Sequence, residues 1–484
     1  MYQQLISYGE SDVYPFHMPG HKRRALPFPN PYTIDITEID GFDNLHHAEG
    51  LIREAEERAA ELYGADRSYY LVNGSTCGLL AAICAAARRG DKVLAARNCH
   101  KAVYHAVSMQ GLAVEFLYPA ITRGDLQGQI TAAQVEEALT KHPDIAVVIL
   151  TSPTYEGIVS DVAAIAACCH AHGAALIVDE AHGAHFGFGA GFPENAVRLG
   201  ADAVIMSLHK TLPSFTQTAL LHCNGTRIDP GRVARYLGVY ETSSPSYLFM
   251  AGMDACIDLL REQGAELFAE YRRRLDAFYR DTADLAQLHV MRREDLCKEE
   301  AYDWDDSKLI IYAGTMGGEA LHQELLGHYH LQMEMVSADY VLGMTSLMDT
   351  DEGMQRLVTA LHEIDEKNRR MAEPHETAEE NRKTELDGEV PEAGFTARMY
   401  RKNPRRMQIY QALDLPYREV PLDEAVGKMA ADYVYLYPPG IPLIVPGEVI
   451  TEEFIRHIRE CRERKLNVEG QGNLAPGRIK IVYF

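Results

Sequence analysis

Lys210 lies in the stretch Ser207–Gln217, which follows the apolar run Ala203–Met206. Such a run predicts a buried strand, so the lysine comes just past a strand end, where open α/β sheets gather their ligands. A lysine amine in that position can bond to a carbonyl group, and the neighbouring Ser207 and His209 could hold a phosphate. A loop lysine after any strand would have the same local sequence, so other residues must decide between the two interpretations.

Polar residues at other points of the chain could belong to the same site as Lys210. Asp179 ends a second apolar run, and its carboxylate could pair with a protonated pyridine nitrogen. His100 follows a third run, and its imidazole could cover the face of a flat ring. Ser75 and Thr76 lie in a glycine turn that opens a helix, where free backbone N–H groups and the positive dipole end bind phosphate. A lysine, a carboxylate, an imidazole and a phosphate cradle together describe a site for pyridoxal phosphate, whose ring withdraws electrons from a substrate α-carbon.

Each of these residues also has a simpler interpretation. Asp179 alone could be a metal ligand, but no GxxxxGK[ST] loop precedes it, so nucleotide hydrolysis is not expected. A lone histidine such as His100 is more often a structural residue, and glycine–serine turns before helices are common. The signal is therefore the combination of polar groups after several strands, and no metal site is expected.

Apolar runs alternate with helical patterns through the first half of the chain. Strands are expected at 68–72, 92–96, 145–150, 174–178 and 203–206, and helices at 54–63 and 79–87. Near-continuous apolar runs that alternate with helices predict a buried, largely parallel sheet. Because parallel strands end at one edge of their sheet, the polar residues that follow them are expected to share a crevice.

The patterns along the chain divide it into five parts. We expect an N-terminal arm over 1–50, a large cofactor-binding domain over 51–275, a small α+β domain over 276–365, a charged linker over 366–394 and a C-terminal domain over 395–484. An arm of this kind often reaches across to another subunit, and a loosely ordered extension is the alternative.

Composition limits the function classes. The chain has 484 residues and a formal net charge of −23, which argues against nucleic acid and anionic membranes and is compatible with a small cationic substrate. Its apolar runs fall well short of the roughly 20 residues of a membrane span. The nine cysteines form no CxxC pair, and the first residues do not resemble a secretory signal, so we expect reduced thiols and a cytoplasmic protein.

Eight stretches, in order along nearly the whole chain, resemble the bacterial ornithine/lysine/arginine decarboxylase family of fold-type-I pyridoxal phosphate enzymes. They are Phe16–Lys22, Asp35–Asp43, Asn73–Gly78, Arg97–Lys101, Asp179–His185, Ser207–Gln217, Thr242–Tyr247 and Tyr437–Glu448. The resemblance implies an aspartate-aminotransferase-like α/β fold with a mainly parallel sheet, a small α+β domain and a C-terminal α+β domain. It also implies a homodimer or higher homo-oligomer with composite active sites, and it points to the short form without an N-terminal wing domain.

The same resemblance gives roles to the polar residues. Lys210 would bond to the aldehyde of pyridoxal 5′-phosphate, Asp179 would pair with the pyridinium and His100 would stack on the ring. The residues implied to hold the phosphate or lie near the cofactor are Ser75, Thr76, Ser207, His209 and His182. The implied reaction is decarboxylation of a basic amino acid, with arginine first, lysine a close second and ornithine third. The alternatives are an aminotransferase on the same fold and a non-catalytic homologue that acts as a binding or regulatory subunit, against which the intact Lys210 and Asp179 argue.

The distal cation of a basic substrate needs a carboxylate or several acceptors once it leaves water. Glu448 is the expected carboxylate, because it ends the proline-rich stretch Tyr437–Glu448, whose prolines would restrict the loop. The alternative is that Glu448 caps the helix expected to begin near Thr451.

Overall fold

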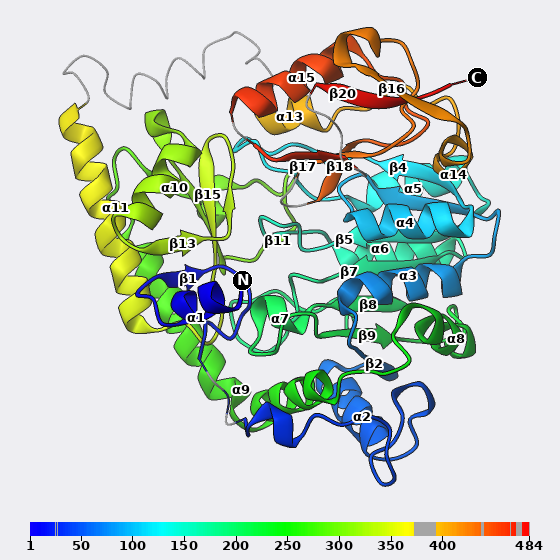
Figure 1. Cartoon of the computed structure of the whole chain (residues 1–484), viewed down its shortest axis with the longest axis horizontal. Helices are drawn as coiled ribbons and strands as arrows, with labels where there is room; N and C mark the ends of the chain where they lie inside the picture. The colour runs from blue at the N-terminus through cyan, green and yellow to red at the C-terminus, as the bar shows by residue number, and fades with distance from the viewer. Residues whose placement is uncertain are drawn as a thin grey trace.

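A computed structural model describes residues 1–24, 26, 28–371, 394–436, 440–464, 466–470 and 477–483 of the chain (Figure 1). Its largest layer is a seven-stranded sheet in the order β2-β9-β8-β7-β5-β3-β4. The strands are β2 (Arg67–Leu71), β3 (Lys92–Ala96), β4 (Ala113–Leu117), β5 (Ile145–Thr151), β7 (Ala175–Asp179), β8 (Ala203–Met206) and β9 (Ala219–Cys223). Within this sheet only β9 runs against its neighbours, so the predicted α/β class with a mainly parallel sheet is confirmed.

Helices cover the sheet because its strands are apolar on both faces. The helices of this region are α2 (Leu51–Tyr63), α3 (Gly74–Ala86), α4 (Lys101–Gln110), α5 (Ala132–Lys141), α6 (Val162–Ala171) and α8 (Pro230–Tyr240). Helix α3 crosses the sheet and contacts β9, β8, β7 and β5, as well as α4 and α8. It can lie that close because of Gly78, where a Cβ atom would stand 2.6 Å from Leu71 Cδ1 and 3.2 Å from Ile205 Cγ2. The glycine thus fixes the helix, and with it the turn that begins the helix, against the sheet.

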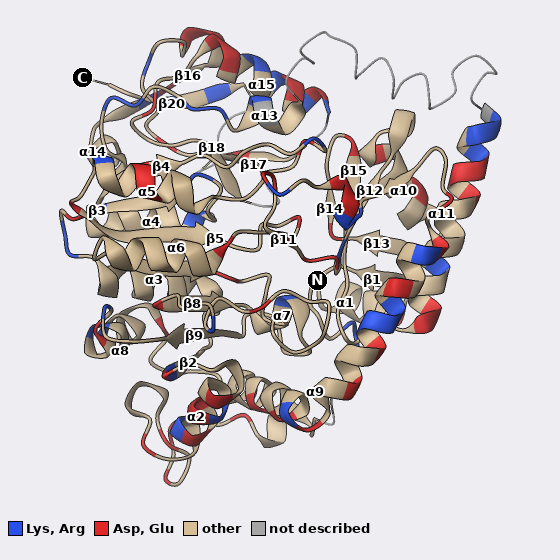
Figure 2. Cartoon of the chain, turned by 180° about the vertical axis from the view of Figure 1, so that it is seen from behind, with Lys and Arg blue, Asp and Glu red and all other residues tan. Residues whose placement is uncertain are grey.

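The small domain lies beside the sheet (Figure 1). It contains an antiparallel sheet in the order β10-β12-β15-β14 and several flanking elements. Their bounds are β10 (His289–Val290), β12 (Lys308–Tyr312), β14 (Met335–Val336), β15 (Tyr340–Met344), α9 (Tyr247–Asp281), α10 (Gly318–Gly327) and α11 (Asp351–Met371). Helix α9 runs without a break through the boundary expected at 275/276, and α11 runs past the one expected at 365/366. Figure 2 shows charged residues of both signs along α11, as is usual for a solvated helix face.

The N-terminal arm packs against its own chain. It contains α1 (Tyr2–Gly9) and β1 (Tyr14–Phe16), and β1 pairs in parallel with β13 (Leu331–Met333) of the small domain. Further along, the Gly20 N–H donates to the carbonyl of His209 at 2.7 Å. A Cβ on Gly20 would lie 2.7 Å from backbone atoms of Leu212, so only glycine allows this approach. The stretch Phe16–Lys22, one of those that resemble the family, therefore packs against the segment of its own chain that contains Lys210.

A C-terminal unit lies above the seven-stranded sheet in Figure 1. Its elements are α13 (Phe395–Met399), α14 (Ile409–Leu413), β16 (Tyr417–Pro421), β17 (Val434–Leu436), β18 (Ile441–Ile444), α15 (Glu452–Glu463), β19 (Val468–Gly470) and β20 (Arg478–Val482). Strand β16 pairs with β20, while β17 lies between β18 and β19. Of the expected linker at 366–394, residues 372–393 lie outside the described residues, as do Tyr437–Pro439 of the proline-rich stretch.

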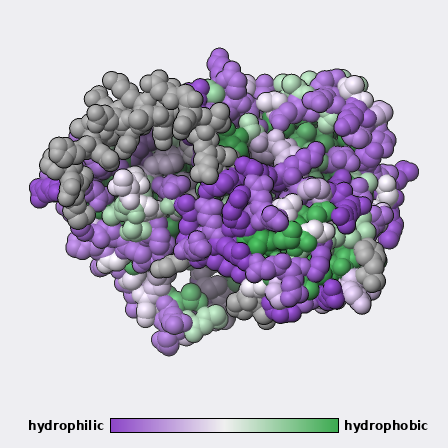
Figure 3. Space-filling view, turned by 90° about the horizontal axis from the view of Figure 1, so that it is seen from above, coloured by the Kyte–Doolittle hydropathy of each residue, from purple (hydrophilic) through white to green (hydrophobic). Residues whose placement is uncertain are grey.

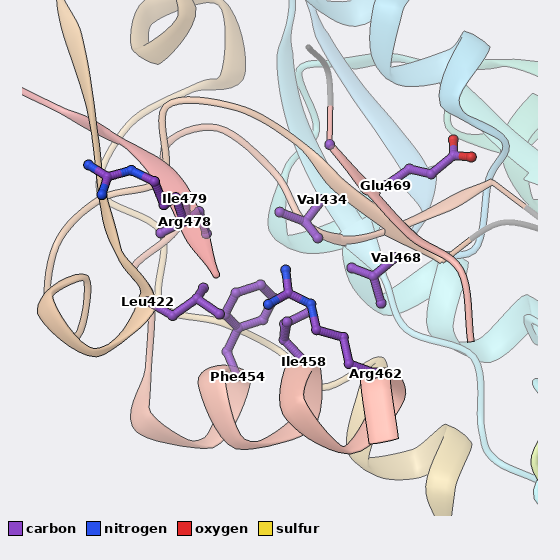
Figure 4. Close-up of a pocket in the computed structure, with 10 residues that line it drawn as sticks. Leu422, Val434, Phe454, Ile458, Arg462, Val468, Glu469, Arg478 and Ile479 are labelled. Carbon is purple, nitrogen blue, oxygen red and sulfur yellow. The ribbon is translucent and has the colours of Figure 1, made fainter. Parts of the chain in front are cut away.

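The C-terminal unit contains a cavity of about 420 Å³ between α15 and the strands (Figure 4). Its floor is apolar, with Phe454, Ile458 and Val434 among the lining side chains, and Arg462 and Arg478 also contribute to its wall. None of the residues predicted to carry chemistry lines it. Hydrophilic residues predominate on the face of the molecule seen in Figure 3. Within the described residues no helix combines the length and apolar character that crossing a membrane requires.

Candidate active site

The carboxyl ends of the central strands open into one cavity of about 460 Å³. Thr151 at the end of β5 is in register with Asp179 at the end of β7, and Asp179 is in register with Ile205 of β8. Lys210 follows β8 in the short helix α7 (Leu208–Thr211). The structure brings eight predicted site residues to this cavity: Ser75, Thr76, His100, Asp179, His182, Ser207, His209 and Lys210. Glu448 is not among the residues that line it.

The side chain of Lys210 contacts an imidazole. Its Nζ lies 3.0 Å from Nε2 of His182. Burial lowers the pKa of Lys210, although the carboxylates of Asp179 and Glu334 oppose that effect. Burial and the nearby Lys210 hold the pKa of His182 well below its ordinary value, so the imidazole is neutral and Nε2 can accept a hydrogen bond from the lysine. An amine whose pKa is lowered is more often in its neutral, nucleophilic form.

Asp179 is a buried carboxylate that forms no ion pair with the residues that the structure describes. One of its oxygens accepts a hydrogen bond from the Ala181 N–H at 3.2 Å, and among the described residues no ion pair forms with this side chain. Burial raises its pKa, and Lys210 acts in the opposite direction. A ligand that places a protonated ring nitrogen next to Asp179 would supply the counter-charge that this buried group lacks.

His100 stands at the N-cap of α4, where its Nδ1 accepts a hydrogen bond from the Ala102 N–H at 3.3 Å. Burial and the nearby Lys210 lower its pKa to about 3, so the ring is neutral at physiological pH. This bond fixes the imidazole at the cavity wall, with its proton on Nε2.

Hydrogen-bond donors gather at one end of the cavity. Helix α3 begins there at Gly74, with its free backbone N–H groups. The hydroxyls of Ser75 and Ser207 lie 2.6 Å apart, and Thr76 belongs to the same wall. His209 donates from Nδ1 to the carbonyl of Thr218 at 2.8 Å, so its Nε2 is left for another partner. Burial lowers the pKa of His209 to about 4. A helix start, hydroxyls and an imidazole nitrogen are the donor set that a phosphate requires.

Three buried polar atoms in the cavity wall lack a hydrogen-bond partner among the described residues. They are Oδ1 of Asn98, Oγ1 of Thr151 and Nδ1 of His182. Buried polar atoms are rarely left unpaired in folded proteins, so these atoms point to a polar ligand in the cavity. Together with the donors beside α3 and the unpaired Asp179, they fit pyridoxal 5′-phosphate, which carries a phosphate, a ring hydroxyl and a ring nitrogen.

The small domain adds a carboxylate that the sequence did not predict. Glu334 lies between β13 and β14 and lines the cavity. Its Oε1 accepts from the Tyr155 hydroxyl at 2.6 Å, and its Oε2 accepts from the Met18 N–H at 2.8 Å. The arm and the small domain are thus joined at the cavity. A single glutamate between two short strands gives no local signal, and only the folded chain brings it near Lys210.

Behind His182 lies a buried charge network. Lys308 on β12 forms an ion pair with Asp305 at 3.2 Å and donates to the carbonyl of His182 at 3.4 Å. Asp305 also bonds Nε2 of His185 at 3.1 Å, and all three of these charged or polar side chains are buried. Although burial opposes it, Lys308 and His185 hold the pKa of Asp305 well below its ordinary value. The network fixes the backbone of His182 and therefore the ring that contacts Lys210.

The expected role of Glu448 has to be corrected. Its carboxylate lies 3.5 Å from the guanidinium of Arg97, and the two side chains are 1% and 3% exposed. It also accepts from the Val445 N–H at 3.1 Å, so it is committed to partners outside the cavity. The alternative fails as well, because Thr451 itself caps α15 by accepting from the Phe454 N–H. With Arg97 donating to the carbonyl of Pro442 at 2.6 Å, Glu448 helps to join the C-terminal unit to the end of β3.

Comparisons with known proteins agree with this geometry. A sequence profile described as "Orn/Lys/Arg decarboxylase, major domain" matches residues 1–295, and one described as the C-terminal domain of the same proteins matches residues 395–470. The arginine decarboxylase of Halalkalibacterium halodurans is 32% identical over 486 residues, which cover 97% of this chain and 94% of that protein.

Solved structures show the same fold. The lysine decarboxylase of Francisella novicida is similar with a TM-score of 0.79 and 18% identity, over 99% of this chain and 80% of that one. An alanine–glyoxylate aminotransferase from Nostoc is similar with a TM-score of 0.52 and 15% identity, over 65% of this chain and 86% of that one. The aminotransferase-like fold that the family resemblance implied is therefore confirmed.

Proposed function

Because this chain belongs to the Orn/Lys/Arg decarboxylase family, we propose that it decarboxylates a basic amino acid with pyridoxal 5′-phosphate, with arginine preferred, lysine a close second and ornithine third. The observation that carries the proposal is a single cavity in which the Lys210 amine and the unpaired Asp179 carboxylate lie together with two further carboxylates, Glu156 and Glu334. The placing of arginine first is supported by the relative from Halalkalibacterium halodurans, which bears the name arginine decarboxylase.

The cavity residues divide the work of holding the cofactor. Lys210 would hold the aldehyde through Nζ, Asp179 would keep the ring nitrogen protonated and His100 would cover the ring face. The phosphate would be held by the donors beside α3, namely Ser75, Thr76, Ser207 and His209. When bound, the cofactor withdraws electrons from the substrate α-carbon, so that the bond to the carboxylate can break and carbon dioxide can leave.

Proton transfer falls to Lys210 and His182. After carbon dioxide leaves, the electron pair remains with the α-carbon, which must gain a proton to give the amine product. With substrate bound, Nζ of Lys210 would be free to deliver that proton. The neutral Nε2 of His182, at 3.0 Å from Nζ, can exchange the proton with it. The Lys308–Asp305 pair positions His182 through its backbone carbonyl.

The electrostatics of the cavity favour a cationic substrate. Glu156 and Glu334 place carboxylates in a largely buried wall, where an interaction with a substrate cation would be stronger than in water. An acidic side chain would be repelled there, and a neutral one would bring no counter-charge to the carboxylates.

The test is to incubate the holoenzyme with arginine, lysine and ornithine separately, and to measure carbon dioxide, the amine product and keto acid. Equimolar carbon dioxide and amine from at least one of them is the expected result. Keto acid without carbon dioxide would identify an aminotransferase and refute the proposal.

We also propose that the protein is a cytoplasmic homodimer. All nine cysteines are free and most are buried, which supports a reducing compartment. The arm exposes Tyr32, Ile39 and Phe42, which are 89%, 50% and 44% exposed. Large apolar side chains grouped on one segment are typical of a surface that another chain covers. Light scattering at assay concentration should give twice the mass of the chain, and full activity in a verified monomer would contradict the proposal.

A further inference from the structure

A second, smaller cavity adjoins the active-site cavity. The two share Gln127 and Glu156 in their walls. The second cavity lies between the small domain and the C-terminal unit, and Tyr340 and Tyr400 are among its other lining residues. Gln127 and Glu156 therefore lie between the space beside Lys210 and a region bordered by tyrosine side chains.

Glu156 stands at the junction with a fixed backbone. Its carbonyl accepts from the indole N–H of Trp304 at 3.1 Å. The next residue, Gly157, has φ +93°, and a Cβ there would lie 2.7 Å from the carbonyl oxygen of Asp305. Only glycine allows this turn, so the loop after β5, including the backbone of Glu156, is held against the small domain.

The carboxylate of Glu156 has neutral partners only. Its carboxylate accepts from the Tyr340 hydroxyl at 3.3 Å and is also hydrogen-bonded to Thr154, and among the described residues no ion pair forms with this side chain. The residue is 8% exposed. Glu334, the other unexpected carboxylate of the cavity, already accepts a hydrogen bond on each oxygen. Both carboxylates thus accept hydrogen bonds from neutral groups, and an ionised buried carboxylate without a counter-ion is costly.

Glu156 and Glu334 also lie near different groups of the cavity wall. Asp179 and Glu334 act electrostatically on the Lys210 amine. Glu156 instead acts on the phenols of Tyr340 and Tyr400, which belong to the second cavity. A substrate whose α-amino group is at Lys210 and whose side chain extends past Gln127 would therefore bring its far end to Glu156.

We propose that Glu156 binds the distal cation of the substrate, a guanidinium or ammonium group, at the junction of the two cavities. This inference rests on the proposed function and assigns the recognition of the side chain to a residue other than Glu448. The substrate cation supplies the counter-charge that Glu156 lacks, and the tyrosine rings beside it suit a planar guanidinium. The loop after β5 thus sets the substrate class, while Lys210 and Asp179 carry out the chemistry.

The experiment compares arginine with citrulline, its neutral isostere, in the wild-type holoenzyme and in Glu156→Gln. We expect KM for arginine to rise roughly 10- to 100-fold, the range for loss of a charge-assisted hydrogen bond, with kcat nearly unchanged. KM for citrulline should not rise, so the preference for arginine should shrink. Calorimetry with the decarboxylated amine of arginine should show the same loss of affinity without turnover.

A matched control and a second variant make the result decisive. Glu56→Gln changes another buried carboxylate, whose pKa burial raises to about 8, but Glu56 lines neither cavity and its variant should keep the arginine preference. Glu156→Asp keeps the charge and should keep part of the preference even if Glu156→Gln folds poorly.

The pH dependence gives an independent readout. Burial raises the pKa of Glu156, and the cation binds the ionised form, so KM for arginine should fall as pH rises through that pKa. Glu156→Gln should lose this dependence. If arginine and citrulline are affected equally by Glu156→Gln, or if neither is affected, the inference is overturned. If the wild-type enzyme decarboxylates no basic amino acid, it is the proposed function that fails.

Discussion

Replacing Glu448 with glutamine should destabilise the protein without weakening substrate binding. The variant removes one charge of the Arg97–Glu448 pair, in which both side chains are almost fully buried and lie 3.5 Å apart. Breaking such a pair leaves a buried charge without compensation, at a cost of about 3–5 kcal/mol. Glutamine keeps an oxygen that can still accept from the Val445 N–H, so the lower end of that range, about 3 kcal/mol, is expected.

The assay is unfolding in guanidinium chloride together with KM for the best basic substrate. The midpoint for the C-terminal unit should fall, because Arg97 and Glu448 join that unit to β3, while KM should stay within about twofold, well inside the tenfold that 1.4 kcal/mol represents. Glu57→Gln is the matched control, since Glu57 pairs with Arg53 at an exposed site worth about 0–1 kcal/mol. An unchanged midpoint with a raised KM would refute this reasoning and return Glu448 to the role of reading the substrate cation.

Two further predictions concern the groups around Lys210. Asp179→Asn should still bind the cofactor through its phosphate, but the rate of decarboxylation should fall by about 100-fold or more, because the charge that keeps the ring nitrogen protonated is lost; near-wild-type turnover would remove Asp179 from this role. Asp305 has its pKa lowered in the folded state by Lys308 and His185, so it contributes stability above its unfolded pKa of about 3.9, and that stability is lost as pH falls below it. Asp305→Asn should already be less stable than the wild type at neutral pH. In acid unfolding followed by circular dichroism, its stability should fall less between about pH 4 and pH 2 than that of the wild type. Parallel curves would contradict the assignment.

The sequence predicted the sheet and the residues at its edge because their signals are local. Apolar runs such as Ala203–Met206 mark buried strands, and the structure has a strand with those bounds. Parallel strands end at one edge, so Asp179 and Lys210 could be placed together without knowledge of the strand order. The domain boundaries were harder to predict, because α9 continues past residue 275 with helical residues on both sides.

The remaining site residues depend on contacts between distant parts of the chain. Glu334 reaches the cavity from the small domain, where β13 pairs with the arm, and nothing around it in the sequence distinguishes it from a surface glutamate. Glu448 shows the opposite case, since its proline-rich surroundings suggested a binding loop. Its actual partner, Arg97, is about 350 residues away in the sequence and follows β3. Charge pairing between such distant residues cannot be deduced from spacing along one chain.

The central claim is that Lys210 is the residue through which this protein decarboxylates a basic amino acid. The most direct measurement is release of labelled carbon dioxide from carboxyl-labelled arginine, lysine and ornithine by the wild-type holoenzyme and by Lys210→Ala at equal, folded concentration. Treatment with borohydride before digestion shows by mass spectrometry which lysine is bonded to the cofactor. We predict labelled carbon dioxide from the wild type alone, and a reduced cofactor adduct on the peptide that contains Lys210. Carbon dioxide release by Lys210→Ala at the wild-type rate, or an adduct on a different lysine, would contradict the account.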